Sequence, residues 1–260
     1  MSALREAATV IIARQGAGGP EVLLLRRSAK VGFFPMAWVF PGGRLDPADV
    51  AMASHSAGDV AGLPDVARPL AVAAVRECFE ESGVWLGSGT PPDGLREALN
   101  AGSATLSPAL GLVPDLARLR LWSRWVTPVI ETRRYDTWFF LTVAPPSQIA
   151  SHDDGETVDS AWVRPADVLH QHERFPLAPP TFRTLEELAT FDTVDAMLAV
   201  QRRVHPVCPR LTSDDDGVWT IVLPGDPSYP VDDFTGAPPP EPVMGPTKIG
   251  FNQGRWWSHR

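Results

Sequence analysis

Short apolar runs alternate with turn-forming stretches in the first part of the chain. Residues 8–13 (ATVIIA) and 21–26 (EVLLLR) predict two strands, and the glycine-rich residues 15–20 predict the turn of a hairpin between them. Residues 38–40 (WVF) predict a further short strand that leads into Pro41-Gly42-Gly43. Two adjacent glycines allow the backbone to approach a ligand closely.

The clearest helical period covers residues 70–83. Val72, Val75 and Phe79 recur at the spacing of one apolar helix face, and Gly83 is a natural C-terminal stop. Residues 46–69 before this helix mix Ala, Gly, Asp and Pro, and they predict a loop-like insert.

The remainder of the chain carries weaker patterns. Helices are predicted over residues 91–100, 113–122, 165–172 and 181–203, and strands over residues 125–131, 137–143, 157–163 and 217–223. After residue 226 the chain becomes rich in proline, which predicts extended, turn or mobile structure. The alternation of strands and helices favours an α/β or α+β sandwich.

Composition narrows the class of protein. The chain has 260 residues, of which 44% are hydrophobic and 21% charged, as expected of one large globular domain with additions. Its net charge of −8 argues against a partner with an extended nucleic-acid backbone, which clustered Lys and Arg would bind. A small phosphorylated substrate remains compatible, because a divalent cation can neutralise acidic side chains and phosphates together.

The cysteines and the apolar segments bear on location. Two cysteines, Cys78 and Cys208, do not make a disulfide scaffold in a chain of this length, and Cys78 is expected to be a buried, reduced thiol. We find no signal-peptide pattern and no apolar run long enough for a membrane span. The sequence therefore predicts a cytoplasmic protein that is not bound to a membrane.

Three carboxylates share one face of the predicted helix. At ~100° per residue, Glu77, Glu80 and Glu81 fall within an arc of about 100° opposite the apolar face. Like charges this close repel each other, and Mg²⁺ removes that conflict because it prefers carboxylate and water oxygens. The alternative interpretation is an acidic, solvated helix face.

The segment Arg76-Glu77-Cys78-Phe79-Glu80-Glu81-Ser82-Gly83-Val84, preceded by Gly42-Gly43 and Asp49, resembles the Nudix box. Residues 50–75 stand where the family normally has a short loop. The resemblance implies a Nudix-type α/β/α sandwich with a mixed central β-sheet, plus a helical and proline-rich C-terminal extension. It implies a Nudix domain over residues 1–205, with the insert at about 50–70, and an extension over residues 206–260.

The resemblance also assigns roles to individual residues. The metal ligands that it implies for Mg²⁺ or Mn²⁺ are Glu77, Glu80, Glu81 and the backbone carbonyl of Gly42. Arg76 matches the arginine that orients a carboxylate, and Asp49 is its expected partner.

The implied reaction is attack of water on a phosphorus of a P–O–P linkage, with a carboxylate taking the proton. Glu80 and Glu81 are the candidate bases, and Glu156, from a later acidic segment, is a further candidate ligand or base. Three acids near Glu156 compete for that role, and a solvated acidic turn is the simpler alternative. The three are Asp153, Asp154 and Asp159.

Segments outside the box resemble one subgroup, the coenzyme A diphosphatases of the peroxisomal type. Four segments carry this resemblance: residues 40–43, the long insert, residues 125–128 (WVTP) and residues 134–140 (RYDTWFF). A coenzyme A signature found in other diphosphatases is not matched at its internal positions, which are Gly32, Phe34 and Met36 here.

The favoured function is therefore hydrolysis of coenzyme A or acyl-coenzyme A. The alternatives are a hydrolase of ADP-ribose, NADH or another nucleotide, and a non-catalytic Nudix-fold binding or regulatory module. Retention of all three box glutamates counts against the module.

Two arginines are candidates for substrate binding. Arg27 follows the second predicted strand, and its alternative is a solvated position at the strand end. Arg134 could bind phosphate through its guanidinium, and its alternative is a structural salt bridge. Trp38, Trp138 and Phe139 are expected in the core rather than stacked on a base. The expected partner is a small nucleotide-like substrate, and the sequence leaves a homodimer open.

Overall fold

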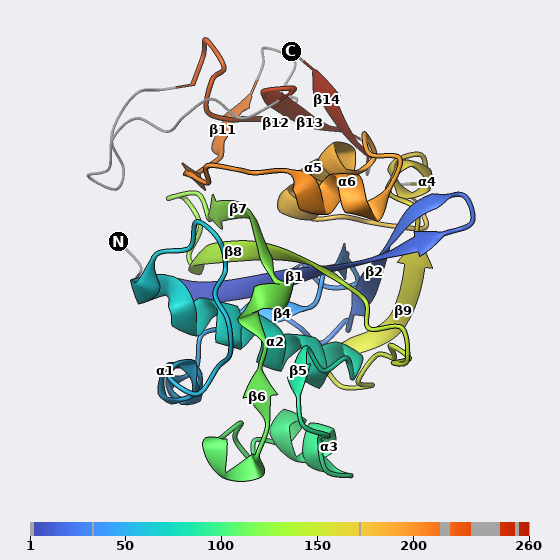
Figure 1. The fold of residues 1–260 in the computed structure, drawn as a ribbon. Helices are drawn as coiled ribbons and strands as arrows, with labels where there is room; N and C mark the ends of the chain where they lie inside the picture. The colour runs from blue at the N-terminus through green and yellow to red at the C-terminus, as the bar shows by residue number, and fades with distance from the viewer. Residues whose placement is uncertain are drawn as a thin grey trace.

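A mixed β-sheet forms the centre of the molecule (Figure 1). The computed structural model describes residues 3–32, 34–171, 173–213, 219–229, 245–252 and 255–259. Within these ranges the sheet has the order β10-β7-β8-β1-β2-β3, with β4 paired to β1 and β9 paired to β2. Its strands are β1 (Leu4–Gly16), β2 (Gly19–Arg27), β3 (Trp38–Val39), β4 (Gly42–Arg44), β7 (Arg120–Val126), β8 (Arg134–Val143), β9 (Thr157–Val163) and β10 (Pro206–Val207).

The sheet is mixed because β1 pairs with β8 and β7 pairs with β10 in parallel, while the other pairs are antiparallel. The predicted hairpin of β1 and β2 is confirmed, and Gly16 pairs with Gly19 at its tip. Strands β8 and β9 also confirm the predicted strands there, with β8 starting earlier than expected.

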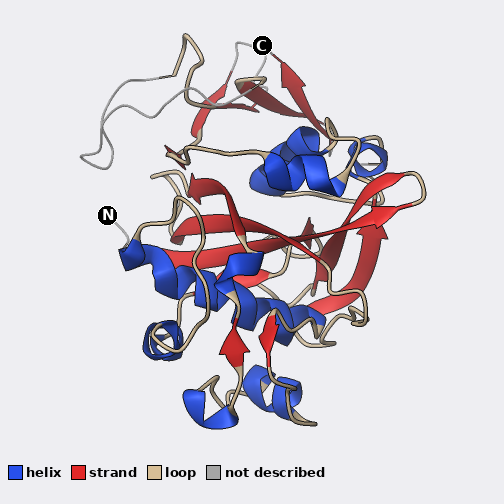
Figure 2. Ribbon diagram, viewed as in Figure 1, coloured by secondary structure: helices blue, strands red, loops and turns tan. Residues whose placement is uncertain are grey.

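Helices cover both faces of the sheet (Figure 2), which confirms the sandwich. Helix α2 (Arg68–Ser82) packs on one face with Val10 and Ile12 of β1. Helices α5 (Pro179–Leu188) and α6 (Val194–Ala199) pack on the other face with Ile11 and Ala13, and α4 (Pro165–Leu169) packs against α5. Alternate residues of β1 thus serve two cores, which explains its continuous apolar run. In the described ranges no helix has the length and apolar character required to cross a bilayer.

Helix α2 forms as its pattern predicts. Val72, Val75 and Phe79 are buried in the core, and the helix ends at Gly83, which adopts a left-handed conformation with φ of 72°. Cys78 on this helix and Cys208 are both buried thiols, as expected for Cys78. Burial raises the pKa of the Cys78 thiol to about 12, so this thiol stays protonated.

The predicted loop over residues 46–69 is corrected by the structure. It contains the helix α1 (Pro47–Ala53) and a 3₁₀ turn at Asp65–Ala67. Asp46 precedes a helix that begins with Pro47, and both residue types are common at these positions. The signal for α1 was therefore present in the sequence.

Two predicted helices were also wrong. Residues 113–122 form β6 (Val113–Pro114), which pairs with β5 (Gly87–Ser88), then a 3₁₀ turn and the start of β7. Residues 181–203 form α5 and α6 rather than one helix, because the Thr193 side chain caps α6 by accepting a hydrogen bond from Ala196 N. The helix predicted over residues 91–100 is present but shorter, and it forms α3 (Leu95–Asn100).

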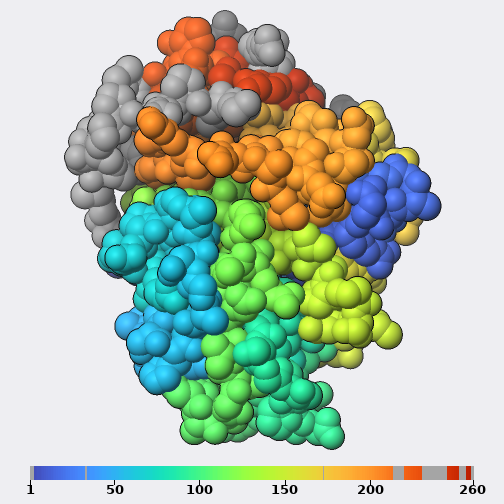
Figure 3. Space-filling model, in the orientation of Figure 1, coloured from blue at the N-terminus to red at the C-terminus, as the bar shows by residue number. Residues whose placement is uncertain are grey.

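The C-terminal extension forms a second, antiparallel sheet beyond α5 and α6 (Figure 1). In the space-filling view its red and dark orange atoms lie at the top of the molecule, next to the orange atoms of α5 and α6 (Figure 3). Its strands are β11 (Arg210–Ser213), β12 (Trp219–Val222), β13 (Lys248–Asn252) and β14 (Arg255–His259). Strand β12 matches the predicted late strand, whereas β13 and β14 were missed. Most of the proline-rich segment, residues 230–244, lies outside the described residues.

Candidate active site

A glycine loop and helix α2 face each other across the candidate site. Gly42 N donates a hydrogen bond to Glu81 Oε2 at 2.9 Å. A Cβ atom at Gly43 would collide with the Glu77 carboxylate, so this carboxylate lies directly against the backbone of β4. Glycine is required at position 43 so that the loop can approach α2 closely. The two adjacent glycines in the sequence predicted such a close approach.

Arg76 connects the carboxylates to one another. Its Nε and one terminal nitrogen bond both carboxylate oxygens of Asp49 at 2.9 Å each, which confirms the predicted pairing. The other terminal nitrogen bonds Glu77 at 2.8 Å and Glu80 at 2.9 Å. Asp49 is 0% exposed and Arg76 is 5% exposed. Helix α1 places Asp49 there, so the long insert preserves the Arg76 pair.

The pKa values of this cluster are shifted because its carboxylates are crowded and largely removed from water. Burial raises the pKa of Glu77 to about 7, although Arg76 opposes the rise. Burial and the neighbouring Glu77 raise the pKa of Glu81 well above its usual range, against the hydrogen bond from Gly42. Burial also raises the pKa of Glu80. Burial alone would lower the pKa of Arg76, but Asp49 and the glutamates outweigh it and raise that pKa.

The carboxylates open into a polar cavity of about 810 Å³. The structure brings seven of the eight candidate site residues to this cavity: Arg27, Gly42, Arg76, Glu77, Glu80, Glu81 and Glu156. Arg27 lies close enough to lower the pKa of Glu81, and Glu156 raises it.

The competitors of Glu156 are placed differently. Asp153 also lines the cavity, but its side chain accepts hydrogen bonds from Thr157 and from the Glu156 backbone, which keep its pKa low despite partial burial. Asp154 and Asp159 do not belong to the cavity lining that the structure describes. Glu156 is thus the later acid best placed to face a substrate.

Arg134 lies outside this cavity. It is buried in the β7–β8 hairpin, where its Nε donates a hydrogen bond to the Thr127 carbonyl at 3.1 Å. The cavity lining that the structure describes does not include Arg134. The geometry favours the structural alternative over contact with substrate.

The sequence did not identify several polar residues of the cavity. Arg5, Arg44, Asn100 and Tyr135 line it. Arg5 reaches the site because β1 pairs in parallel with β8, and Tyr135 is its register partner. No local pattern reveals such a pairing, although Arg44 could have been suspected because it directly follows Gly43.

The donor set fits a divalent cation. In the described part of the chain, no three acidic, histidine or cysteine side chains already form a metal-binding group. Glu77 and Glu80 bond Arg76, and Glu81 bonds Gly42. However, the three carboxylates, of which Glu81 is buried and Glu77 and Glu80 are partly buried, offer the hard oxygen donors that Mg²⁺ and Mn²⁺ prefer. Because Gly43 has no Cβ, the Glu77 carboxylate has room beside the loop backbone.

Comparison with known proteins decides the family. The family model described as "NUDT19 Nudix domain" matches residues 52–188, a range that contains Arg76 and the three glutamates. The chain belongs to the Nudix hydrolase family, in its NUDT19 subgroup. It is accordingly a Nudix diphosphatase, and Nudix hydrolases generally use a divalent metal.

The similarity to known proteins extends over most of the chain. "Acyl-coenzyme A diphosphatase NUDT19" of Gallus gallus is 32% identical over 89% of this chain and 82% of its own length. The Homo sapiens protein of the same name is 32% identical over 67% of this chain and 62% of its own length. A solved Nudix hydrolase from Alicyclobacillus acidocaldarius is 32% identical, with a TM-score of 0.67 over 77% of this chain and 97% of that one.

Proposed function

We propose that this Nudix diphosphatase hydrolyses the diphosphate linkage of coenzyme A or acyl-coenzyme A. The observation that supports this substrate is the similarity to acyl-coenzyme A diphosphatases over most of the chain, across the segments that hold the carboxylates. Water would add to one phosphorus as the bridging P–O bond breaks. The products would be an adenosine nucleotide and a phosphorylated pantetheine arm.

The chain's own residues divide the work of binding. Glu77, Glu80, Glu81 and the Gly42 carbonyl would hold Mg²⁺ or Mn²⁺, which supplies neutralisation of phosphate oxygens when bound. Arg76 keeps Glu77 and Glu80 on one side of the cavity through its two hydrogen bonds.

Arg27 lines the same cavity and can bind phosphate oxygens through its guanidinium. Glu80 and Glu81 are the proposed proton acceptors, because both carboxylates line the cavity beside the proposed metal site. Glu156, on the same cavity, is the alternative base.

The test is a panel of coenzyme A, acetyl-coenzyme A, ADP-ribose and NADH, each with Mg²⁺, Mn²⁺ or a chelator. We expect metal-dependent cleavage of the coenzyme A compounds, and a fall in kcat of about 100-fold or more in Glu81→Gln. Glu97→Gln, an exposed glutamate on α3, is the matched control and should keep full activity. Cleavage of ADP-ribose or NADH alone would replace the proposed substrate, and equal activity of Glu81→Gln and wild type would remove Glu81 from the mechanism.

Three expectations for the whole protein stay predictions. They are the division into a domain over residues 1–205 and an extension over residues 206–260, a homodimer, and a cytoplasmic location.

A further inference from the structure

An apolar cavity of about 310 Å³ adjoins the acidic cavity. The two cavities share Thr9, Arg27, Gly42, Tyr135 and Thr137 in their linings. A substrate with its diphosphate among the glutamates therefore has direct access to the apolar cavity for one of its two arms. The volume lies at the lower end of the range of about 300–1,000 Å³ usual for small-molecule sites.

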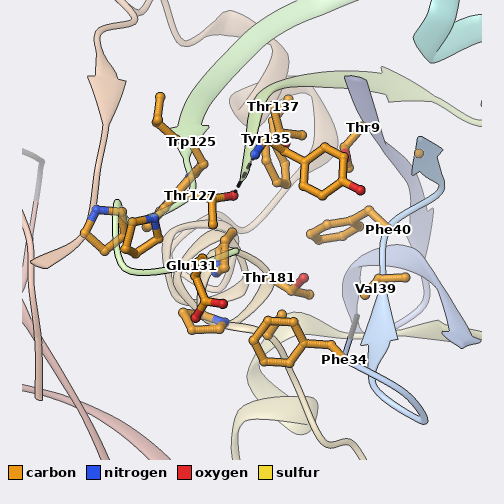
Figure 4. Close-up of a pocket in the computed structure, with 18 of the residues that line it drawn as sticks. Thr9, Phe34, Val39, Phe40, Trp125, Thr127, Glu131, Tyr135, Thr137 and Thr181 are labelled. Atoms are coloured by element: carbon orange, nitrogen blue, oxygen red, sulfur yellow. Dashed lines mark hydrogen bonds between the residues drawn. The ribbon is translucent and has the colours of Figure 1, made fainter. Parts of the chain in front are cut away.

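The walls of this cavity suit a hydrocarbon better than a nucleobase. Phe34, Val39 and Phe40 lie on one side, and Trp125 lies across from them (Figure 4). Four further wall residues, Pro128, Pro179, Pro180 and Pro209, have no backbone N–H to donate.

The hydroxyl of Thr127 already accepts a hydrogen bond from Tyr135 N at 3.0 Å. Away from the residues shared with the acidic cavity, the only other polar side chains in the described lining, apart from the tryptophan indoles, are Glu131 and Thr181. Specific reading of a base edge requires several placed donors and acceptors, whereas an aliphatic chain requires mainly apolar contact.

The C-terminal sheet supplies one wall of the cavity. Leu211 of β11, Ile221 of β12 and Trp256 of β14 line it. Trp256 Nε1 donates a hydrogen bond to the Leu177 carbonyl at 2.8 Å, which fixes β14 to the segment before α5. This wall comes from outside the residues of the Nudix box, so it can vary without altering the carboxylates.

We propose that the apolar cavity binds the acyl group carried by the pantetheine arm, and that the C-terminal sheet limits the acyl length. This inference rests on the proposed function, because it requires a coenzyme A thioester as substrate. It adds a specificity role for Leu211, which is 36% exposed and faces the cavity from β11.

The experiment compares kcat/KM for free, butanoyl-, octanoyl- and hexadecanoyl-coenzyme A in the full chain. Leu211→Trp fills the cavity, so the ratio of octanoyl- to free coenzyme A turnover should fall about tenfold. Leu211→Ala enlarges it, so the preferred acyl length should increase. Thr212→Trp is the matched control, because Thr212 is exposed, is not part of the cavity lining and points to the other side of β11. It should leave the ratio unchanged.

The outcomes separate this inference from the proposed function. Unchanged ratios and lengths in both Leu211 variants, with coenzyme A still cleaved, would overturn the inference and leave the function intact. An equal fall for free coenzyme A, acyl-coenzyme A and ADP-ribose would mean that the cavity binds the nucleoside instead. If the wild type cleaves no coenzyme A compound, both the proposed function and this inference are wrong. Because Leu211 is partly exposed, Leu211→Ala keeps the test available if Leu211→Trp does not fold.

Discussion

Asp49 and Arg76 form a buried ion pair beneath the carboxylate cluster. Breaking a buried ion pair typically costs about 3–5 kcal/mol. Without Asp49, Arg76 would keep its bonds to Glu77 and Glu80 but lose two of its hydrogen bonds, so the cost should lie at the lower end of that range. We therefore expect Asp49→Ala to lower the free energy of unfolding by about 3 kcal/mol in urea denaturation. Activity should fall as well, because Arg76 would no longer be fixed where it bonds Glu77 and Glu80.

The matched control for Asp49→Ala is Asp59→Ala. Asp59 also pairs with an arginine, Arg68, but its side chain is 85% exposed. Exposed pairs contribute about 0–1 kcal/mol, so this variant should remain close to wild type. Equal stability of the two variants would show that burial of the Asp49–Arg76 pair does not matter.

The residues of the site differ in how visible they were from the sequence. Glu77, Glu80 and Glu81 share one helical face, so periodicity alone groups them, and the Nudix resemblance added Gly42 and Asp49. Arg5 could not be found in this way, because the parallel pairing of β1 with β8 brings it to the cavity. Arg134 was misleading, since an arginine in a hairpin has the same sequence signal whether it meets a phosphate or a backbone carbonyl.

At the scale of elements, β4 and α2 must approach closely for the site to form. Gly43→Ala places a methyl group on the Glu77 carboxylate, so either the loop or Glu77 must move. We expect kcat to fall at least tenfold, with little change in stability, because a 1 Å displacement of positioning groups can cost about 100-fold. Steady-state kinetics and thermal unfolding of the same preparation would measure both quantities.

Gly83→Ala gives the opposite result and is the control for Gly43→Ala. Gly83 ends α2 with φ of 72°, a conformation that strains an alanine. Stability should fall by about 1 kcal/mol while kcat stays within about twofold of wild type. If Gly43→Ala instead lost stability and kept activity, Glu77 would not need its place against β4.

The errors in predicted elements have physical causes. Residues 120–122 carry a helical pattern, but the pairing of β7 with β8 overrides it. Local periodicity does not reveal pairing with a distant strand. The break between α5 and α6 was locally encoded, because Thr193 is a good N-cap residue. Strands β13 and β14 have only five residues each and follow a proline-rich segment, whose composition predicts irregular structure.

At the scale of the whole molecule, the C-terminal sheet and the Nudix sheet lie on opposite sides of α5. Ile221, Leu223 and Ile249 join the same core as Leu185 of α5. Sequence reasoning could predict an extension after the Nudix domain but not its second sheet, because the partners of those strands depend on pairing across residues 223–247. The apolar cavity between the two sheets was therefore beyond prediction.

The carboxylate cluster should make the stability of the metal-free protein fall as pH rises. The pKa of Glu77 is about 7 in the folded protein and near 4.5 when unfolded, so the folded state binds more protons between these values. Raising the pH through this window removes that proton and favours unfolding. Between pH 6 and pH 8 we expect Glu77 to account for a loss of about 1 kcal/mol.

Urea unfolding in a chelator at pH 6 and pH 8 measures this loss. Glu77→Gln cannot ionise, so its stability should decline less over the interval than that of wild type or of the exposed Glu97→Gln. Added Mg²⁺ or Mn²⁺ should raise the stability of wild type at pH 8 more than at pH 6, because a ligand that binds only the ionised folded state shifts the equilibrium toward folding. An identical pH dependence in wild type and Glu77→Gln would mean that Glu77 does not change its protonation in the folded protein between pH 6 and pH 8. Arg76 alone would then set the charge state of Glu77 in the metal-free protein, through the hydrogen bond between them.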